Sequence, residues 1–292
     1  MSKNKPMKTN IIKIVIISFA GSLCLLAKLP AQQEKADEIL NKFFEQAESM
    51  HSTEFIMKMN ERKQGEMHQK KALFKIIHQP FHFYYYQYYP KKGMEVLYVD
   101  GWNNNKAMIN TNTFPWVNVN LAPQSTMMRQ DHHHAITNAG FKYLAGVIEK
   151  FIYHHGTSNV SVKYHGQKNF NGKQCYAISI ENNSYHYSEY KVQPGGNIID
   201  IAMKKYLSDY MIVDKNKNVD DFYDVKEGDI IKIPSSYAKK MVMYLYPKTY
   251  LPGFLKVWDD EGLYEEFNFL DIQINPSFDK DEFSEDHHEY DF

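Results

Sequence analysis

The stretch FHFYYYQYYPKKGMEVLY, residues Phe81 to Tyr98, decides the fold, because it contains two strand-like halves with a break between them. Successive residues of a strand point to opposite faces of a sheet, so the stretch has two rows of side chains. The row on one face is Phe81, Phe83, Tyr85, Met94, Val96 and Tyr98. The row on the other face includes Tyr84, Tyr86 and Tyr88. Pro90 and Gly93 interrupt the alternation, which predicts two antiparallel strands joined by a turn.

The alternating pattern continues on both sides of this stretch. From Phe55 to Leu121, breaks such as Gln64-Gly65 and Pro80 divide the region into about five or six strands of a meander. Later strands are predicted at residues 160–165, 174–181, 239–246, 254–258 and 263–275. Asn171-Gly172 is expected to turn the chain between the first two of these, because both residues tolerate a positive φ.

Two segments have helical periodicity instead. Residues 34–50 (EKADEILNKFFEQAESM) and residues 135–155 place their apolar residues three and four positions apart. We expect both helices to pack an apolar face on the sheet. Helices that pack on an antiparallel sheet give an α+β fold class.

Composition limits the classes of partner. The chain has 292 residues, which allows two units, and 43% of them are hydrophobic. Its formal net charge of −1 leaves no basic surface for a phosphate backbone, so nucleic acid is not an expected partner. The acidic residues from Asp279 to Phe292 are expected to form a solvated terminus.

The N-terminus has the pattern of a cleaved export signal. Lysines lead into an apolar run from Ile14 to Ala27, which is followed by Leu29-Pro30-Ala31. We therefore predict a signal peptide at residues 1–31, a mature chain that begins at about Gln32, and export to the periplasm or cell envelope. No transmembrane span is expected in the mature protein, although an uncleaved N-terminal anchor stays open. Cleavage would leave Cys175 alone, without a disulfide partner.

Residues 190–234, YKVQPGGNIIDIAMKKYLSDYMIVDKNKNVDDFYDVKEGDIIKIP, differ from their surroundings. Apolar residues around Ile198 and Ile201 repeat near 3.6 positions, whereas Ile231 and Ile233 alternate. The segment resembles a LysM module, and the matching residues occur in the same order along the chain. The matching residues are Tyr190, Lys191, Val192, Gly195, Ile198, Ile201, Ala202, Tyr206, Ile212, Asn216, Gly228, Ile231, Ile233 and Pro234. The resemblance implies a βααβ module at residues 188–235, although Gly196 stands where LysM modules commonly have an aspartate that caps the first helix.

LysM modules bind polymers that contain N-acetylglucosamine, so the resemblance implies peptidoglycan as a partner. The implied groove has two sides, formed by Gly195, Gly196, Asn197 and Ile198 and by Asn216, Asn218, Val219 and Asp220. Amide groups and an apolar floor suit an N-acetyl group. The alternative is that these residues only form turns and helix caps.

The sequence around this module also has resemblances. Lys248-Thr249, Leu251-Pro252 and Asp260-Glu261-Gly262 resemble the closing hairpins of the LolA/LolB-type lipoprotein-carrier fold. KGMEVLYVDGWNNNKAMI and HHHAITNAG, within residues 92–140, resemble a family of exported bacterial proteins of unknown function. These resemblances imply a discontinuous host domain, residues 32–187 and 236–292, in which a curved antiparallel half-barrel and its helices enclose an apolar cavity for a lipid or acyl chain.

We expect that cavity to be lined by the first row of the opening stretch. Its members are Phe81, Phe83, Tyr85, Met94, Val96 and Tyr98. The alternative is that these side chains are ordinary packed core, because aromatic residues fill cores in any fold.

No catalytic residue, metal site or cofactor is predicted. Asp131-His132-His133-His134 is the most suggestive cluster, but consecutive residues point in different directions and rarely bind one ion together. His154 and His155 fit better as cations at a helix C-terminus, and Cys175 as a packed strand residue. Glu265 and Glu266 alternate on a strand, so one is expected to be paired and the other solvated.

The sequence thus predicts an exported, non-enzymatic binding protein of the cell envelope. It would bind peptidoglycan through the LysM module and would have a possible carrier cavity in the host domain. Two alternatives stay open. One is a cell-wall enzyme that uses the Asp131 to His134 cluster, and the other is a wall-tethered structural scaffold.

Overall fold

The computed structural model describes residues 16–130, 132–153 and 159–292, with side chains from Gln32 onward. The lysines before the predicted signal run, Asp131, His154 and His155 lie outside the described residues. Helix α1 spans Ile16–Glu48, so it is one continuous helix across the predicted cleavage site. No helix in the described part of the chain is long and apolar enough to cross a membrane.

The fold is α+β and is dominated by one open antiparallel sheet of 11 strands, in the order β6-β5-β4-β3-β2-β1-β13-β12-β11-β8-β7. The first six are β1 (Ser52–Lys63), β2 (Glu66–His78), β3 (Phe81–Tyr89), β4 (Glu95–Val99), β5 (Ala107–Asn110) and β6 (Val119–Leu121). The others are β7 (Val160–Phe170), β8 (Lys173–Asn182), β11 (Lys240–Leu245), β12 (Pro252–Trp258) and β13 (Leu263–Ile274). The predicted meander is therefore present, and the pairing of β1 with β13 joins it to the C-terminal strands.

The hairpin of β7 and β8 has the predicted turn, but its first strand is longer than predicted. Asn171 and Gly172 have φ values of 51° and 76°, so the predicted turn is present. Strand β7 continues to Phe170, although the pattern predicts an end at His165. The register shifts between Tyr164 and Gln167, so a bulge reverses the alternation while the ladder continues beyond it.

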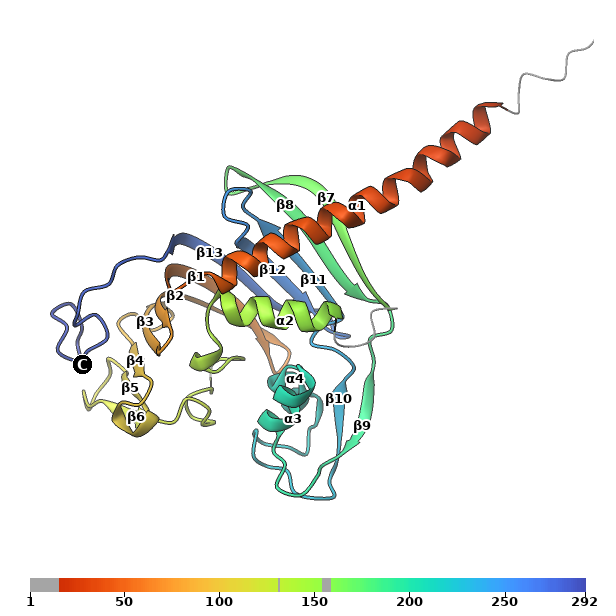
Figure 1. The fold of residues 1–292 in the computed structure, drawn as a ribbon. Helices are drawn as coiled ribbons and strands as arrows, with labels where there is room; N and C mark the ends of the chain where they lie inside the picture. The colour runs from red at the N-terminus through yellow and green to blue at the C-terminus, as the bar shows by residue number, and fades with distance from the viewer. Residues whose placement is uncertain (1–15, 131, 154–158) are drawn as a thin grey trace, which may run out of the picture.

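Helices α1 and α2 (Phe141–Tyr153) lie across one face of the sheet (Figure 1). Each buries a stripe of apolar residues at helical spacing, as the sequence predicts. The buried residues of α1 are Ala36, Ile39, Leu40, Phe43 and Ala47. Those of α2 are Phe141, Ala145, Ile148, Phe151 and Ile152. Both helices share one hydrophobic core with strands from the two halves of the sheet.

The segment between β8 and β11 forms a second, smaller unit with its own core. Its elements are β9 (Tyr187–Lys191), α3 (Ile198–Lys205), α4 (Asp209–Lys215) and β10 (Ile230–Pro234), and the two strands pair antiparallel. Asn197 caps α3, since its side chain accepts a hydrogen bond from the Asp200 amide at 2.9 Å. The cap that Gly196 does not supply is thus provided by the next residue.

A buried arginine attaches this smaller unit to the segment between β6 and α2. The guanidinium of Arg129 donates to both carboxylate oxygens of Asp209 on α4, at 2.7 and 2.8 Å, and also to the His133 carbonyl. Arg129 is 2% exposed, and its guanidinium also lies 3.9 Å from the Phe222 ring centroid. Tyr210 of α4 stacks on His133 with 4.2 Å between ring centroids.

Most acids of the C-terminal tail are exposed, as predicted, but the tail packs on the sheet and buries Glu282 and His287. The Tyr290 ring stacks on Tyr84 with centroids 3.8 Å apart, and the Asp291 amide donates to Glu95 at 2.9 Å. Glu282 is 7% exposed and forms an ion pair with Lys75. The tail therefore covers part of the outer tyrosine row of β3, whose ring surface offsets the cost of ordering an acidic segment. Figure 1 shows the C-terminus beside these strands.

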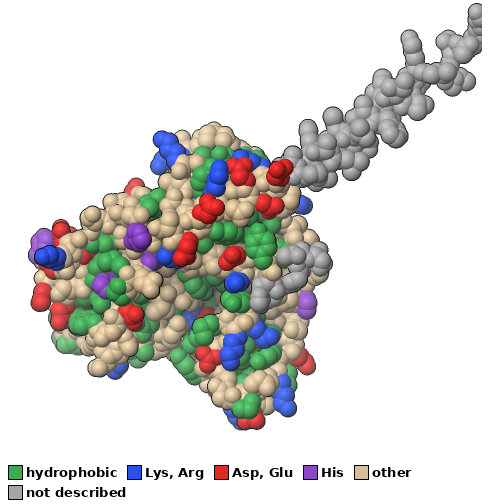
Figure 2. All heavy atoms as spheres, viewed as in Figure 1, with side chains coloured by type: hydrophobic (Ala, Val, Ile, Leu, Met, Phe, Trp, Pro, Cys, Tyr) green, Lys and Arg blue, Asp and Glu red, His purple; other side chains and the backbone are tan. Residues whose placement is uncertain are grey.

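Acidic and basic side chains are interspersed on the face of the molecule in Figure 2, in keeping with the net charge of −1. That face carries no extended basic patch of the kind that binds a phosphate backbone.

Replacing Asp209 with Ala is expected to destabilise the protein by about 3–5 kcal/mol, because it leaves the buried Arg129 charge unpaired. Urea unfolding with an unchanged m-value measures this difference. The exposed Asp220→Ala is the matched control and should change stability by less than about 0.5 kcal/mol. The double variant Arg129→Met/Asp209→Leu should recover most of the loss. A loss from Asp209→Ala no larger than that of the control would contradict a buried attachment.

Candidate functional site

An apolar cavity of about 330 Å³ lies between the sheet and α2. Its size falls within the range of small-molecule sites. The strands contribute side chains from both halves of the sheet, for example Phe55 of β1, Val96 of β4 and Leu255 of β12, and α2 contributes Tyr143, Leu144 and Val147. The cavity is thus a space within the core that the curved sheet and α2 leave unfilled.

Six methionines line this cavity, which is an unusual share of the 14 in the chain. They are Met57, Met59, Met94, Met127, Met128 and Met241. Methionine is unbranched and polarisable, so its side chain adapts to ligands of varied shape at low cost. A methionine lining suits flexible apolar chains better than one rigid ligand.

Four of the six residues expected to line a cavity do so. Phe83 and Tyr85 come from β3, Val96 comes from β4, and Met94 immediately precedes β4. Phe81 and Tyr98 do not line it. Their rings instead pack against each other in the core, with centroids 6.1 Å apart. The alternation therefore identifies the correct face of the sheet, whereas the position of each residue along the strand decides whether it meets the cavity.

One end of the cavity is polar. Glu61, His132, His134, Asn138, Tyr143 and Tyr237 line it. The His134 Nε2 lies 3.0 Å from Glu265 Oε1 and 3.4 Å from the Tyr237 hydroxyl. His132 Nδ1 lies 3.2 Å from the Lys70 ammonium. A ligand with an apolar chain and a polar group would find partners for both.

This polar end is built around two carboxylates that face each other across the sheet. Glu61 of β1 and Glu265 of β13 are direct partners in the antiparallel register. They are 2% and 1% exposed. Like charges opposite each other destabilise a sheet, so cations are needed beside them. His133 and His134 lie against Glu265, and Lys70 lies 3.4 Å from Glu61.

His133 is the centre of this arrangement and is 0% exposed. Its Nδ1 lies 2.8 Å from Glu265 Oε1, and its Nε2 lies 2.9 Å from the Arg62 carbonyl oxygen. Both partners only accept hydrogen bonds, so the ring satisfies them when both nitrogens carry protons. Glu61, His133 and Glu265 are also close enough to hold a metal ion together, which would take the place of the Nδ1 proton. Without an ion, the contacts form an ion-pair network.

The charges of the network shift the titration of its members. Burial is the largest single influence on Glu265 and would raise its pKa, but His134 and His133 together outweigh it and hold the pKa at about 2. Burial would likewise lower the pKa of His134, but the charge and hydrogen bond of Glu265 raise it. The pair is thus stabilised as carboxylate and imidazolium.

The sequence reading found the histidines but missed Glu61 and Tyr237. Glu61 lies near the end of β1 and is buried, and an acid on an inward-facing strand position was the available signal. Glu265 is buried and paired, whereas Glu266 is half-buried and pairs with Lys256 at 3.1 Å. Cys175 is buried on β8, and burial raises the pKa of its thiol, which fits the packed role predicted for it.

Beside the cavity lies an exposed apolar loop. Phe114 and Trp116 are 84% and 68% exposed, and Val117 is also exposed. The loop joins β5 to β6, and its neighbours Thr111 and Val119 line the cavity. No residue from 111 to 128 carries a charge, in a chain in which 24% of residues do. Phe114, Trp116 and Val117 therefore form an exposed apolar rim at the cavity, within an uncharged segment.

The residues predicted to form a sugar groove have divided roles. Gly195, Asn218 and Asp220 are exposed, and Gly196 and Asn197 are half-buried. Ile198 and Val219 are buried in the small core, and the Ile198 amide donates to the Phe222 carbonyl at 3.0 Å, which brings the two sides together. Asn216 bonds the Ile212 carbonyl and both backbone groups of Lys232. The Asn216 amide thus ties α4 to β10, the turn-and-cap role that the sequence left open.

Comparison with known proteins gives one family. The model of a domain described as a protein of unknown function (DUF1571) matches residues 50–203, which is 154 of the 292 residues. The match covers the KGMEVLYVDGWNNNKAMI and HHHAITNAG segments and ends inside α3. No curated protein matches the sequence.

Several solved structures share part of the architecture. LprF from Mycobacterium bovis is 9% identical with a TM-score of 0.42, and the match covers 85% of this chain and 96% of that one. The lipoprotein LppX from Mycobacterium tuberculosis is 8% identical with a TM-score of 0.40, covering 84% and 99%. A LolA superfamily protein from Nitrosomonas europaea is 9% identical with a TM-score of 0.30, covering 84% and 96%. At these values the likeness assigns no function to this chain.

Replacing Glu265 with Gln should destabilise the protein by about 3–5 kcal/mol at neutral pH, because the buried imidazolium groups lose their counter-charge. The depressed pKa of Glu265 contributes stability above the unfolded pKa of about 4.3, and this contribution is lost as pH falls from there to about 2. The variant should therefore lose less stability than the native chain over that range. Urea unfolding between pH 2 and pH 7 measures both effects.

Glu266→Gln is the matched control for this prediction. It changes the neighbouring residue, which faces the other side of the sheet and is half-exposed, so its effect should stay below about 1 kcal/mol. Equal effects of the two substitutions, or an unchanged acid profile in Glu265→Gln, would show that Glu265 carries no special charge pair.

Proposed function

This chain belongs to the DUF1571 family, and we propose that it is an envelope protein that binds an amphiphile, with the apolar chain of the ligand in the cavity and its polar group at His134. The observation that carries the proposal is the cavity itself, which combines a methionine-rich lining with a polar end. The export-type N-terminus supports a location in the periplasm or cell envelope.

Burial of an acyl chain supplies a large part of the free energy for such binding. Each CH₂ group removed from water stabilises the complex by roughly 0.8 kcal/mol. A chain of about ten carbons would thus contribute roughly 8 kcal/mol against an association cost of about 4–15 kcal/mol, so the polar contacts also matter. His134, Tyr143 and Tyr237 supply donors for a carboxylate, phosphate or ester oxygen.

The apolar rim supports loading from a lipid surface. A tryptophan and a phenylalanine that project from an uncharged segment favour the interface of a bilayer, where no charge has to be desolvated. Phe114 and Trp116 would rest there while the cavity behind them receives the chain. The fold thus supports a carrier or extraction role. Catalysis is not part of the proposal, because the buried His133 is held between Glu265 and a backbone carbonyl.

The lipid prediction is tested by filling the cavity. Leu144→Trp places a large side chain in the lining of the cavity. We expect it to weaken binding of a fluorescent fatty acid at least about 10-fold, because a ligand that buries two fewer CH₂ groups already loses that much affinity. Met203→Trp, on an exposed position of α3, is the matched control and should bind as the native chain does. Fluorescence titration gives the affinities, and circular dichroism verifies that each variant is folded.

A second variant separates loading from binding. Phe114→Ser/Trp116→Ser should leave the affinity for the soluble probe unchanged, because neither residue lines the cavity, and should slow uptake from phosphatidylglycerol-containing vesicles. No probe binding by the native chain, or equal binding by Leu144→Trp, would refute the cavity site.

We further propose that residues 188–235 are a LysM module that binds peptidoglycan. The order β9, α3, α4, β10 and the separate small core support this, together with the exposed Gly195, Asn218 and Asp220 near the turn before α3 and the loop after α4. The module would act as a docked wall-binding unit and not as a freely hinged one, because Asp209 attaches it to Arg129.

Co-sedimentation with purified peptidoglycan tests this module. Asn218→Trp should block the groove and weaken the affinity for peptidoglycan at least about 10-fold, which corresponds to a loss of about 1.4 kcal/mol. The pelleted fraction should fall accordingly. Lys204→Trp, on exposed α3, is the control and should pellet as the native chain does. Point variants suit this test better than excision of the module, which would leave Arg129 unpaired. Absence of pelleting by the native chain, or equal pelleting of both variants, would remove peptidoglycan as a partner.

A further inference from the structure

The C-terminal tail holds a group of metal-ligating side chains that the cavity and the module do not use. Residues 279–290, DKDEFSEDHHEY, contain six acids and two histidines in a run of turns. Backbone hydrogen bonds from Ser284 to Asp281 and from His287 to Ser284 fold the run back on itself. The turns bring residues six and seven positions apart in the sequence together.

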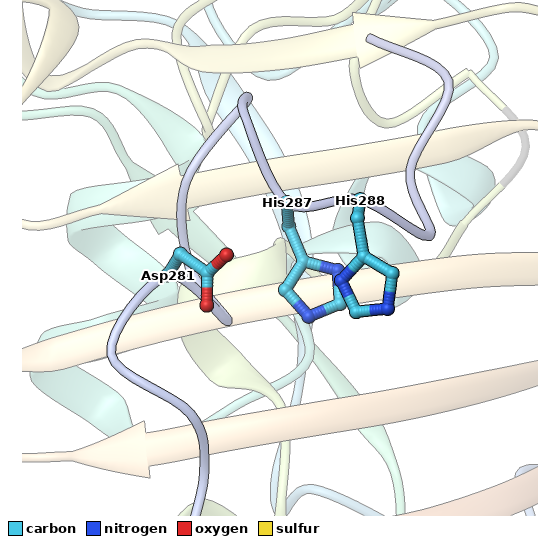
Figure 3. A group of neighbouring side chains, drawn as sticks. All are labelled: Asp281, His287 and His288. Atoms are coloured by element: carbon cyan, nitrogen blue, oxygen red, sulfur yellow. The ribbon is translucent and has the colours of Figure 1, made fainter.

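Three of these side chains converge. One potential ligand atom each of Asp281, His287 and His288 lies within 4.8 Å of the others, and the two imidazole rings lie side by side with centroids 4.8 Å apart (Figure 3). Neighbouring histidines on a strand or helix point apart, but the turn at this position removes that obstacle. Asp281 and His288 are exposed, so the group is open to solvent.

His287 is already held in place for such a role. It is 4% exposed, and its ring lies 4.2 Å from that of Tyr290. Its Nε2 lies 3.9 Å from Glu282, whereas its Nδ1 accepts a long hydrogen bond of 3.3 Å from the Glu289 amide. An ion at Nδ1 would replace this long hydrogen bond from the Glu289 amide, and the proton on Nε2 would stay directed at Glu282. A carboxylate behind the distal nitrogen of a histidine is the usual second partner of a metal-bound imidazole.

The tail is also anchored independently of any ion. Glu282 pairs with Lys75, Tyr290 donates to Glu282 at 2.9 Å, and Tyr290 stacks on Tyr84. The side chains that hold the tail are therefore different from the exposed Asp281 and His288. An ion bound by Asp281 and His288 would therefore add to a tail that is already folded, and would not have to fold it.

We propose that Asp281, His287 and His288 form a binding site for one divalent transition-metal ion, with Zn²⁺ as the best fit. Two imidazole nitrogens and one carboxylate oxygen are a donor set that Zn²⁺ accepts, and a fourth position remains for water or an outside ligand. Nitrogen donors disfavour Mg²⁺ and Ca²⁺, which require oxygen. The ion would link residues 281 and 287–288 and so fasten the tail over the outer face of β3. This inference does not depend on the proposed lipid or peptidoglycan binding.

The test is titration of the untagged full-length chain with Zn²⁺ by isothermal calorimetry. We expect one ion per chain, and Co²⁺ in place of Zn²⁺ should give the visible absorption of a four-coordinate site. His288→Gln and Asp281→Asn should each weaken binding at least about 10-fold, since each removes one of three protein ligands. Glu285→Gln is the matched control, because it removes one charge from the same exposed tail outside the group.

Thermal unfolding gives a second measurement that does not depend on absolute affinity. Zn²⁺ at 100 times its Kd should stabilise the native chain and Glu285→Gln by about 2.7 kcal/mol, and at the same concentration a 10-fold loss of affinity should reduce the stabilisation of His288→Gln to about 1.4 kcal/mol or less. Equal loss of affinity in Glu285→Gln and Asp281→Asn would reduce the effect to general charge attraction and overturn the site. Absence of binding, or several weak ions per chain, would overturn it as well.

Discussion

The pairing of Glu61 with Glu265 is the constraint on which the rest of the structure depends. It lies where β1 joins β13, the strand pair that unites the two halves of the sheet. Two carboxylates buried opposite each other would separate these strands if they were not neutralised. His133, His134 and Lys70 supply the positive charge. A polar network inside an otherwise apolar core is therefore a condition for pairing β1 with β13.

The segment that supplies these histidines also links the other parts of the molecule. Met127, Met128, Gln130, His132 and His134 of this segment line the cavity. His133 and His134 contact Glu265, and Arg129 binds Asp209 of the smaller unit. Cavity, charge pair and smaller unit thus share one stretch of backbone. A ligand that alters His134 would act on the same stretch that holds the module, which gives a direct physical route between the two proposed binding sites.

The central strands are covered on both sides, and the two covers differ in kind. The inner row of β3 meets the cavity through Phe83 and Tyr85, where packing is incomplete. The outer row meets the C-terminal tail through Tyr84 and Tyr290. An outer row of tyrosines left in water would be an exposed aromatic surface, so an acidic tail with aromatic residues of its own covers it and keeps charge at the surface.

The sequence by itself determined the elements and their faces. Alternation placed the strands and identified the face that carries Phe83, Tyr85 and Val96, because the period of a strand is local and covalent. Helical spacing placed α1 and α2 in the same way. Tertiary structure decided the register of β1 on β13, which of the row residues meet the cavity, and the packing of the tail on β3. These depend on contacts between residues about 200 positions apart, such as Glu61 with Glu265 and Glu95 with Asp291, which no local period encodes.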